Sequence, residues 1–140
     1  NVMKRVVAEI TPILEDTFDI EIIEKHHNQK VDAPSGTAIM LAEAINEACD
    51  ARYVYEYDRH SRRMKRPKHE IGIHSIRGGT IVGEHEVLFA GRDEQLSLKH
   101  TITSKEVFAV GAVNAAAFLM GKPEGLYDMS DLLAEQQKGE

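Results

Sequence analysis

The chain has 140 residues, which is enough for one ordinary domain with its own hydrophobic core, and its composition is that of a soluble globular protein. Its formal net charge of −6 argues against nucleic acid as the main partner, and no apolar run is long enough to span a membrane. The single cysteine, Cys49, excludes an internal disulfide and fits a reducing compartment; we find no signal peptide and expect a cytoplasmic protein.

The first segment predicts a helix. One apolar stripe at helical spacing consists of Val2, Met3, Val6, Val7 and Ile10. Thr11-Pro12 interrupts this stripe, which indicates either a second short helix or a kink in one long helix. The helical pattern already runs at Asn1 without an initiator methionine, so we expect a cut from a longer protein.

A strand, a short polar loop and a helix start come next. Phe18, Ile20 and Ile22 alternate with polar neighbours, as a half-buried strand requires. The strand is followed by His26, His27 and Lys30. Pro34-Ser35-Gly36-Thr37 then opens a helix that continues to about Cys49, with Ser35 as its N-cap.

The segment between residues 53 and 69 contains a short strand and a basic stretch. Tyr53–Tyr57 alternates in polarity and predicts the strand. Arg59–His69 is dense in Arg and Lys, which is typical either of a phosphate or nucleic-acid site or of a mobile, solvated loop. A surface that binds single-stranded nucleic acid needs aromatic residues between the basic ones, and this stretch has none, so we favour the loop.

Three further segments read as strands, and each has one face of alternating residues. These faces are Ile71, Ile73, Ser75 and Arg77; Ile81, Gly83, His85, Val87 and Phe89; and Leu96, Leu98, His100 and Ile102. Gly78-Gly79 predicts a hairpin between the first two segments. Thr103-Ser104-Lys105-Glu106 predicts a capping box for an Ala-rich helix that stops at Gly121. Residues 125–133 predict a loop and one last short helix.

The order of elements predicts an α+β fold. We expect a mixed, largely antiparallel sheet of about four or more strands, with helices packed on one face. The other face would be left open, and we expect a homo-oligomer to bury it. Residues 1–140 are interpreted as a single domain.

The polar loop between the strand and the helix is the candidate site. His26, His27 and Lys30 lie where catalytic groups tend to be found, and imidazole is the natural proton donor near neutral pH. The helix start at Gly36 and Thr37 attracts anions, because unpaired N–H groups and the positive end of the helix dipole converge there. A solvated charged loop with a helix cap is the alternative interpretation.

Metal binding is not expected. Ligands could come from His26, His27, His74, His85 and His100. Adjacent histidines on a strand point to opposite faces, however, and the chain has neither a His-Glu-x-x-His pattern nor a cysteine pair. We interpret His85 and His100 as partly buried histidines that hydrogen-bond within the sheet.

The run from His26 to Ala38, His-His-Asn-Gln-Lys-Val-Asp-Ala-Pro-Ser-Gly-Thr-Ala, closely resembles the signature of dihydrodipicolinate reductase, also called 4-hydroxy-tetrahydrodipicolinate reductase. Ser75–Gly79, Ile81–His85 and Gly125–Met129 fit in the same order. The resemblance covers essentially the whole chain. It implies NADPH- or NADH-dependent reduction of a cyclic dicarboxylate to tetrahydrodipicolinate, on the diaminopimelate route to lysine, by a homotetramer joined through its sheets.

The resemblance also implies roles for single residues. His26 matches the proton donor, Lys30 a second donor, and His27 a residue that contacts substrate. Gly36 and Thr37 match the pair that holds one carboxylate at the helix start. To these we add two neighbours. Ser35 adjoins the site, and Arg77 could pair with the second carboxylate or could form an ion pair at the sheet edge.

The chain departs from the family in one respect, because it has no dinucleotide-binding domain with a Gly-rich turn. Gly78-Gly79 opens another strand and is no phosphate cradle. We therefore expect no cofactor-binding residue here, no turnover by this chain alone, and a tail at 122–140 that would normally pack on the missing cofactor domain. Two other interpretations stay open: a related imino-acid or amino-acid dehydrogenase domain, and a non-catalytic dicarboxylate-binding assembly module. A nucleic-acid module built on residues 59–68 is a more distant one.

Overall fold

The structure, a computed structural model, describes residues 1–138. The chain divides into two compact units, one formed by Met3–Thr103 and the other by the first two residues with the segment from Ser104 onward. The interpretation of residues 1–140 as one domain, with a tail at 122–140 that packs on a cofactor domain, stays a prediction. No helix in the described residues is long and apolar enough to cross a membrane.

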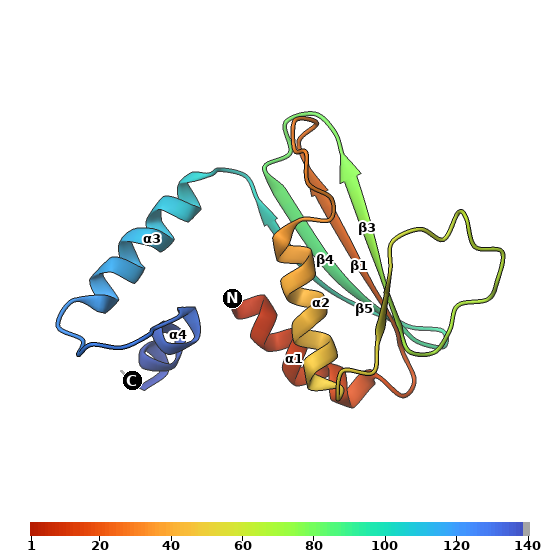
Figure 1. The fold of residues 1–140 in the computed structure, drawn as a ribbon, viewed down its shortest axis with the longest axis horizontal. Helices are drawn as coiled ribbons and strands as arrows, with labels where there is room; N and C mark the ends of the chain where they lie inside the picture. Colours follow the sequence, from red (N-terminus) through yellow and green to blue (C-terminus); the bar gives the residue numbers. More distant parts are fainter. Residues whose placement is uncertain (139–140) are drawn as a thin grey trace. The chain divides into compact units, whose positions relative to one another are not determined.

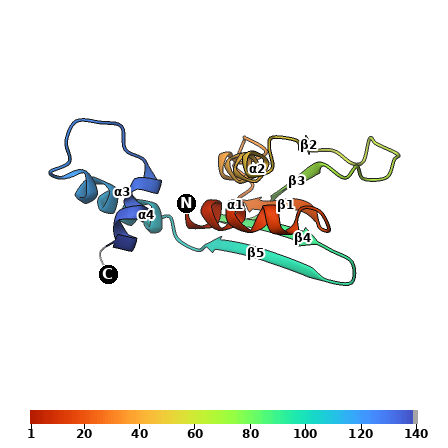
Figure 2. The ribbon, with the colours of Figure 1, turned by 90° about the horizontal axis from the view of Figure 1, so that it is seen from below.

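The first unit is built on a mixed sheet of five strands. The strands are β1 (Asp19–His26), β2 (Val54–Glu56), β3 (Glu70–Arg77), β4 (Gly83–Ala90) and β5 (Gln95–Ile102). Their order in the sheet is β2-β3-β1-β4-β5, and Figure 2 shows β3, β1, β4 and β5 following one another in this order. β1 lies at the centre, parallel to β3 and antiparallel to β4.

Two helices cover one face of this sheet (Figure 1). Helix α1 (Val2–Leu14) is a single helix that contains Pro12, so no second short helix begins there. Val7 is its fully buried apolar residue. Helix α2 (Gly36–Ala48) begins after the N-cap Ser35, whose side chain accepts a hydrogen bond from the Ala38 N–H. This cap confirms the helix start predicted from the sequence.

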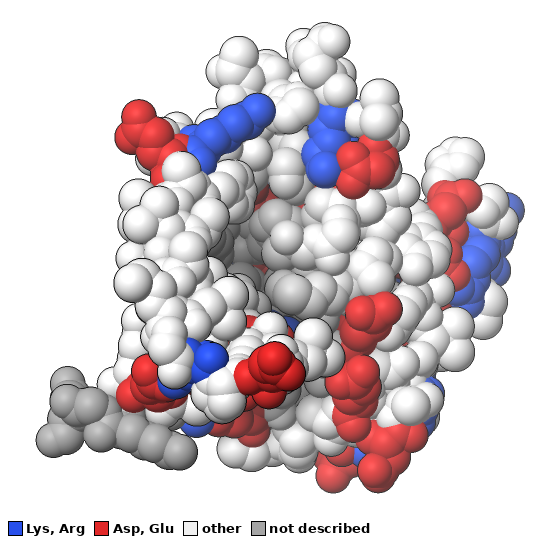
Figure 3. All heavy atoms as spheres, turned by 60° about the vertical axis from the view of Figure 1, so that its left-hand side comes forward, with Lys and Arg blue, Asp and Glu red and all other residues white. Residues whose placement is uncertain are grey.

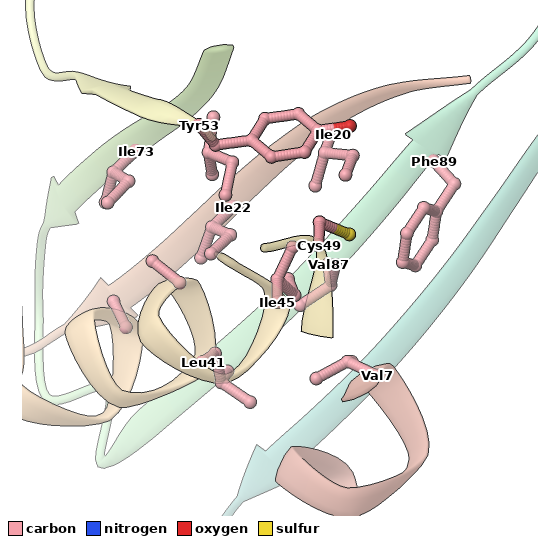
Figure 4. Close-up of a cluster of buried hydrophobic side chains, with 13 residues drawn as sticks. Val7, Ile20, Ile22, Leu41, Ile45, Cys49, Tyr53, Ile73, Val87 and Phe89 are labelled. Carbon is pink, nitrogen blue, oxygen red and sulfur yellow. The ribbon is translucent and has the colours of Figure 1, made fainter. Parts of the chain in front are cut away.

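The hydrophobic core lies between these helices and the sheet. Figure 4 shows Val7 of α1 and Leu41 and Ile45 of α2 beside side chains from β1, β3 and β4. Ile20 and Ile22 of β1 have no exposed surface. Full burial of one such side chain stabilises the fold by about 2 kcal/mol, so this face of β1 fixes the register of the central strand.

The prediction of a hairpin at Gly78-Gly79 is wrong. β3 and β4 do not pair with each other; each pairs with β1, one on either side. The connection therefore crosses the end of β1, and the Gly78 N–H donates to the carbonyl of His26 (3.0 Å). Two of the four strand pairings are parallel, so the sheet is mixed, as expected, but less antiparallel than the sequence indicated.

The second unit contains helices α3 (Glu106–Leu119) and α4 (Met129–Lys138). The predicted capping box at the start of α3 is not formed, because the N-cap is Lys105 and makes no side-chain capping bond. Within this unit the Phe118 and Tyr127 rings meet edge to face, with centroids 5.9 Å apart. The last helix runs further than the sequence predicted.

Candidate functional site

The candidate site lies at the edge of the sheet where β1 and β3 end. The two strands are parallel, so their last residues, His26 and Arg77, lie side by side in register. β4 is antiparallel to β1, so its first residues come to the same edge. The loop after β1 leads into the start of α2, and the topology thereby gathers polar residues from four segments.

Glu24 is the centre of this cluster and is completely buried. Its Oε2 receives hydrogen bonds from Nη1 of Arg77 (2.8 Å) and Nδ1 of His26 (2.6 Å). Its Oε1 accepts hydrogen bonds from Nη2 of Arg77 (2.8 Å) and from the backbone N–H of Ser35 (3.2 Å). A buried carboxylate is stable only when its charge is paired and its oxygens are satisfied, and both conditions are met here.

The ionised form of Glu24 is strongly favoured. Burial alone would raise the pKa of this carboxyl, but the hydrogen bonds from Arg77 and His26 outweigh it and hold the pKa at about 2. A negative charge is therefore held at Nδ1 of the His26 imidazole.

The ring of His85 on β4 meets the His26 ring edge to face, with the two ring centroids 5.2 Å apart. Its Nε2 is 2.8 Å from Oγ of Ser35. Burial first, and then the neighbouring His26, lower the pKa of His85 to about 4, so this ring is neutral at pH 7. Because Ser35 Oγ already accepts the Ala38 N–H, the arrangement suits its hydroxyl donating to the neutral ring.

Lys30 and Asp32 extend the network outward. The Lys30 N–H donates to the carbonyl of His27 (3.2 Å), so residues 27–30 form a turn. Nζ of Lys30 lies 2.8 Å from Oδ1 of Asp32, and the carbonyl of Asp32 accepts Nη2 of Arg77 (2.6 Å). Lys30 is thereby linked to Glu24 through Asp32 and Arg77.

The first turn of α2 borders this network. Gly36 and Thr37 are exposed, and the first amides of a helix have no acceptor within it. An open pocket of about 360 Å³ lies beside the same loop, lined by Ala33, Pro34, Tyr57, Ile73 and Ser75. The arrangement can hold an anion at the helix start and supply protons from nearby imidazole and ammonium groups.

The predicted site residues therefore lie in one region but fall into two groups with different contacts. His26, Ser35 and Arg77 join through Glu24, whereas Gly36 and Thr37 present the exposed helix start. Both Nη atoms of Arg77 bond to Glu24, which is the ion pair at the sheet edge that the sequence offered as one of two interpretations. The pairing of Arg77 with a ligand carboxylate stays a prediction.

Sequence reasoning missed Glu24 and misjudged His85. The signal for Glu24 was available, because it continues the alternation of Ile20 and Ile22 and so had to lie on the buried face of β1. His85 is more deeply buried than expected and bonds to Ser35 outside the sheet, while His100, its register partner, is exposed. Among the described residues, no group of three or more His, Cys, Asp or Glu is placed to hold a metal ion.

The basic stretch 59–69 forms ion pairs with the sheet, so its interpretation as a mobile, solvated loop needs revision. Arg59 and Arg66 both contact Oε1 of Glu21 on β1, at 2.7 and 3.0 Å, and Arg62 contacts the buried Glu70 (3.1 Å). These arginines are therefore engaged within the protein. Figure 3 shows one face of the molecule, and no broad basic area appears on it.

Comparison with known proteins gives consistent matches. The family described as "Dihydrodipicolinate reductase, C-terminus" matches residues 1–133. Proteins named 4-hydroxy-tetrahydrodipicolinate reductase from Clostridium tetani and Caldanaerobacter subterraneus subsp. tengcongensis are 54% and 53% identical over 95% of this chain. The chain spans about half the length of these relatives, 52% and 53% respectively.

A solved structure has the same fold. It is a dipicolinate-bound dihydrodipicolinate reductase from Paenisporosarcina sp. TG-14, with a TM-score of 0.71 and 27% sequence identity. The match covers 93% of this chain and 49% of that one.

Proposed function

Because the chain belongs to the family of dihydrodipicolinate reductase C-terminal domains, we propose that it is the substrate-binding and catalytic half of a 4-hydroxy-tetrahydrodipicolinate reductase of lysine biosynthesis. The observation that carries this proposal is that Glu24 joins His26 to Ser35, the N-cap of α2, while Lys30 is paired with Asp32 in the loop between them. The dipicolinate bound to the similar reductase from Paenisporosarcina supports a planar cyclic dicarboxylate as ligand.

Each residue has a chemical task in this proposal. The amides of Gly36 and Thr37 hold one carboxylate of the substrate at the positive end of α2, and His27 contacts the substrate beside them. Lys30 holds an anionic group by charge and serves as a second donor. The 4-hydroxyl of the substrate leaves as water, which gives a conjugated ring. One hydride and one proton then remove one double bond of that ring, and His26 supplies the proton.

The hydride is the part of the reaction that this chain does not provide. A reduced nicotinamide, NADPH or NADH, supplies it when bound, but Gly78-Gly79 joins two strands and does not precede a helix, so it does not fit a dinucleotide phosphate. We therefore propose that the nucleotide is held by another part of a full-length cytoplasmic reductase. This chain alone should bind substrate analogue without turning over.

We also propose that the enzyme is a homotetramer joined through the sheet. The face of the sheet opposite α1 and α2 carries Ile23, Ile76 and Leu88 among ion-paired side chains. Such a mixed face suits an interface between copies of the chain.

The proposal is tested by calorimetry with pyridine-2,6-dicarboxylate, a planar analogue of the substrate. Lys30→Ala should weaken binding by at least about tenfold to a hundredfold, since a charge-assisted hydrogen bond is lost. Lys68→Ala is the matched control, because Lys68 bonds the carbonyl of Asp16 away from the site. Unchanged affinity in Lys30→Ala would remove Lys30 from the site, and failure of the unmodified chain to bind would count against the proposal itself.

A further inference from the structure

Resting on the proposed function, we propose that Glu24 is a positioning residue for the reaction. It holds the ring of His26 with a proton on Nδ1, so that Nε2 is the nitrogen that faces and protonates the substrate. Glu24 itself touches neither substrate nor cofactor in this proposal and acts only through His26.

The contacts of Glu24 leave its carboxylate no freedom to turn. Two donors reach each oxygen, from Arg77 and His26 on Oε2 and from Arg77 and Ser35 on Oε1. The fork of Arg77 fixes the plane of the carboxylate, since both Nη atoms lie 2.8 Å from its oxygens. Oε2 is therefore aimed at Nδ1 of His26 before any ligand arrives.

The edge of the His26 ring that carries Nε2 lies next to Gly83 of β4. A Cβ atom added to Gly83 would come 3.3 Å from Nε2 of His26 and would meet no other residue within 4 Å. The missing side chain at this position lets the ring of His26 lie close to β4. Because Nδ1 is held by a buried acid, Nε2 is the ring nitrogen that remains to donate a proton, and this fixed orientation is what a one-directional proton donor needs.

The proton balance follows from this division. The imidazolium gives its Nε2 proton to the ring carbon of the reduced substrate and becomes neutral imidazole, with the remaining proton on Nδ1 still bonded to Glu24. Glu24 gains no proton in the step, as its strong pairing with Arg77 requires. Solvent then returns a proton to Nε2.

Other charged and titratable groups also face His26, and each has a separate partner. His85 is bonded to Ser35, Lys30 is paired with Asp32, and Arg77 is paired with Glu24. Among these contacts, Glu24 is the one made directly to a nitrogen of His26.

The chain provides a control for this inference on the same strand. Glu21 contacts Nε2 of His74 at 2.6 Å and is paired with Arg59 and Arg66, so it has the same Glu–His–Arg composition. Glu21 lies on the opposite face of β1, away from the start of α2, and its histidine is 41% exposed. A purely structural role for such a cluster should give similar results for both glutamates.

The experiment compares Glu24→Gln with Glu21→Gln in the full-length reductase. Glu24→Gln should lower kcat by about 10- to 1,000-fold, because His26 is then misoriented. KM should change less than about threefold, because the amides of Gly36 and Thr37 still hold the substrate carboxylate. Glu21→Gln should leave kcat unchanged. Histidine-selective 15N NMR without substrate, at a pH where the ring is neutral, should show the remaining proton of His26 on Nδ1 in the unmodified enzyme and on either nitrogen in Glu24→Gln.

A double-mutant cycle decides between positioning and general stability. In a His26→Gln background, Glu24→Gln should cause no further loss of kcat. An additive loss, equal losses in the Glu21 and Glu24 variants, or an unchanged His26 tautomer would overturn the inference. An inactive unmodified enzyme would refute the proposed function instead, while the NMR comparison would still test the contact.

Two further variants keep the inference testable if Glu24→Gln does not fold. Glu24→Asp keeps the charge for Arg77 but is one methylene too short for His26, and Gly83→Ala displaces the ring from the opposite side. Both should lower kcat with little change in KM. Full activity in both would overturn the inference.

Discussion

His85 couples the protonation state of a buried ring to the stability of the site. It is 4% exposed, and burial together with the neighbouring His26 lowers its pKa from 6.5 to about 4. In the unfolded chain the same histidine takes up a proton near pH 6.5. Between these two values the unfolded state binds more protons than the folded state, so the folding stability contributed here is present above pH 6.5 and is lost as the pH falls to 4.

We therefore predict that His85→Gln flattens the acid dependence of stability. The difference between the two pKa values corresponds to about 3 kcal/mol, lost by the unmodified protein but not by the variant between pH 6.5 and pH 4. Urea unfolding at a series of pH values measures it. His100→Gln is the control, because His100 is the exposed register partner of His85. Parallel pH curves for the unmodified protein and His85→Gln would rule out His85 as the source.

Single residues differed in how far the sequence could predict them. Ser35 was predicted as an N-cap because capping depends on local spacing alone, and its bond to Ala38 confirms it. The partner of Arg77 could not be predicted in the same way, because Glu24 lies 53 residues away and meets Arg77 only through the parallel pairing of β1 and β3. The role of His85 required knowing that β4 begins at the same edge.

Arg66 makes more contacts than any other residue that holds the segment between β2 and β3 in place. Arg66 contacts Asp19 (2.9 Å) and Glu21 (3.0 Å) and donates to the backbone carbonyls of Ile20 (3.0 Å) and Glu70. Gly72 makes room for this arrangement, since a Cβ there would lie 1.8 Å from the carboxylate of Glu21. The segment is long and irregular, so these ion pairs replace regular backbone pairing in fixing it.

We predict that Arg66→Gln loosens residues 57–69 without unfolding the sheet. The amide cannot reproduce the forked contacts of the guanidinium, so backbone amides of the segment should exchange with deuterium about tenfold faster or more, for a loss of about 1–3 kcal/mol. Hydrogen–deuterium exchange with mass spectrometry measures this. Lys65→Gln, a neighbouring exposed position, should leave the exchange unchanged. Equal exchange in Arg66→Gln and the unmodified protein would show that the segment is held by other contacts.

Elements were predicted better than their pairing. The alternation of Ile20 with Ile22 and the apolar stripe of α2 gave the correct strand and helix, because each pattern repeats within a few residues. The Gly78-Gly79 turn was misassigned because a glycine pair is compatible with a hairpin and also with a connection that crosses a third strand. Only the long-range pairing of β1 with both neighbours distinguishes the two.

At the scale of the whole molecule, the first unit leaves one face of its sheet uncovered by its own helices α1 and α2. Ion pairs cross this face, including Lys25 and Lys99 on either side of Glu84, and they hold the pKa of Glu84 at about 2. From the sequence we expected an open face that a homo-oligomer buries, and the structure shows this face to be charged, with scattered apolar positions. An assembly through this face would therefore depend on charge as well as on apolar burial.

Ile76 tests the proposed tetramer because its side chain is 45% exposed on that face, in register with Lys25. We predict that Ile76→Arg shifts the native mass of the full-length protein from tetramer toward smaller species. The substitution removes apolar contact area and adds a cation beside Lys25, and each effect opposes association by about 1 kcal/mol or more per copy. Because the position is already exposed within one chain, the melting temperature of the dissociated subunit should be little affected.

Ile13→Arg is the matched control for this prediction. Ile13 is 79% exposed, and it lies on α1, on the opposite side of the sheet. The same apolar-to-cationic change there should leave the native mass at four chains. If both variants stay tetrameric, the assembly uses another surface. If both dissociate, added charge in general causes the effect, and the open face of the sheet is not supported as the interface.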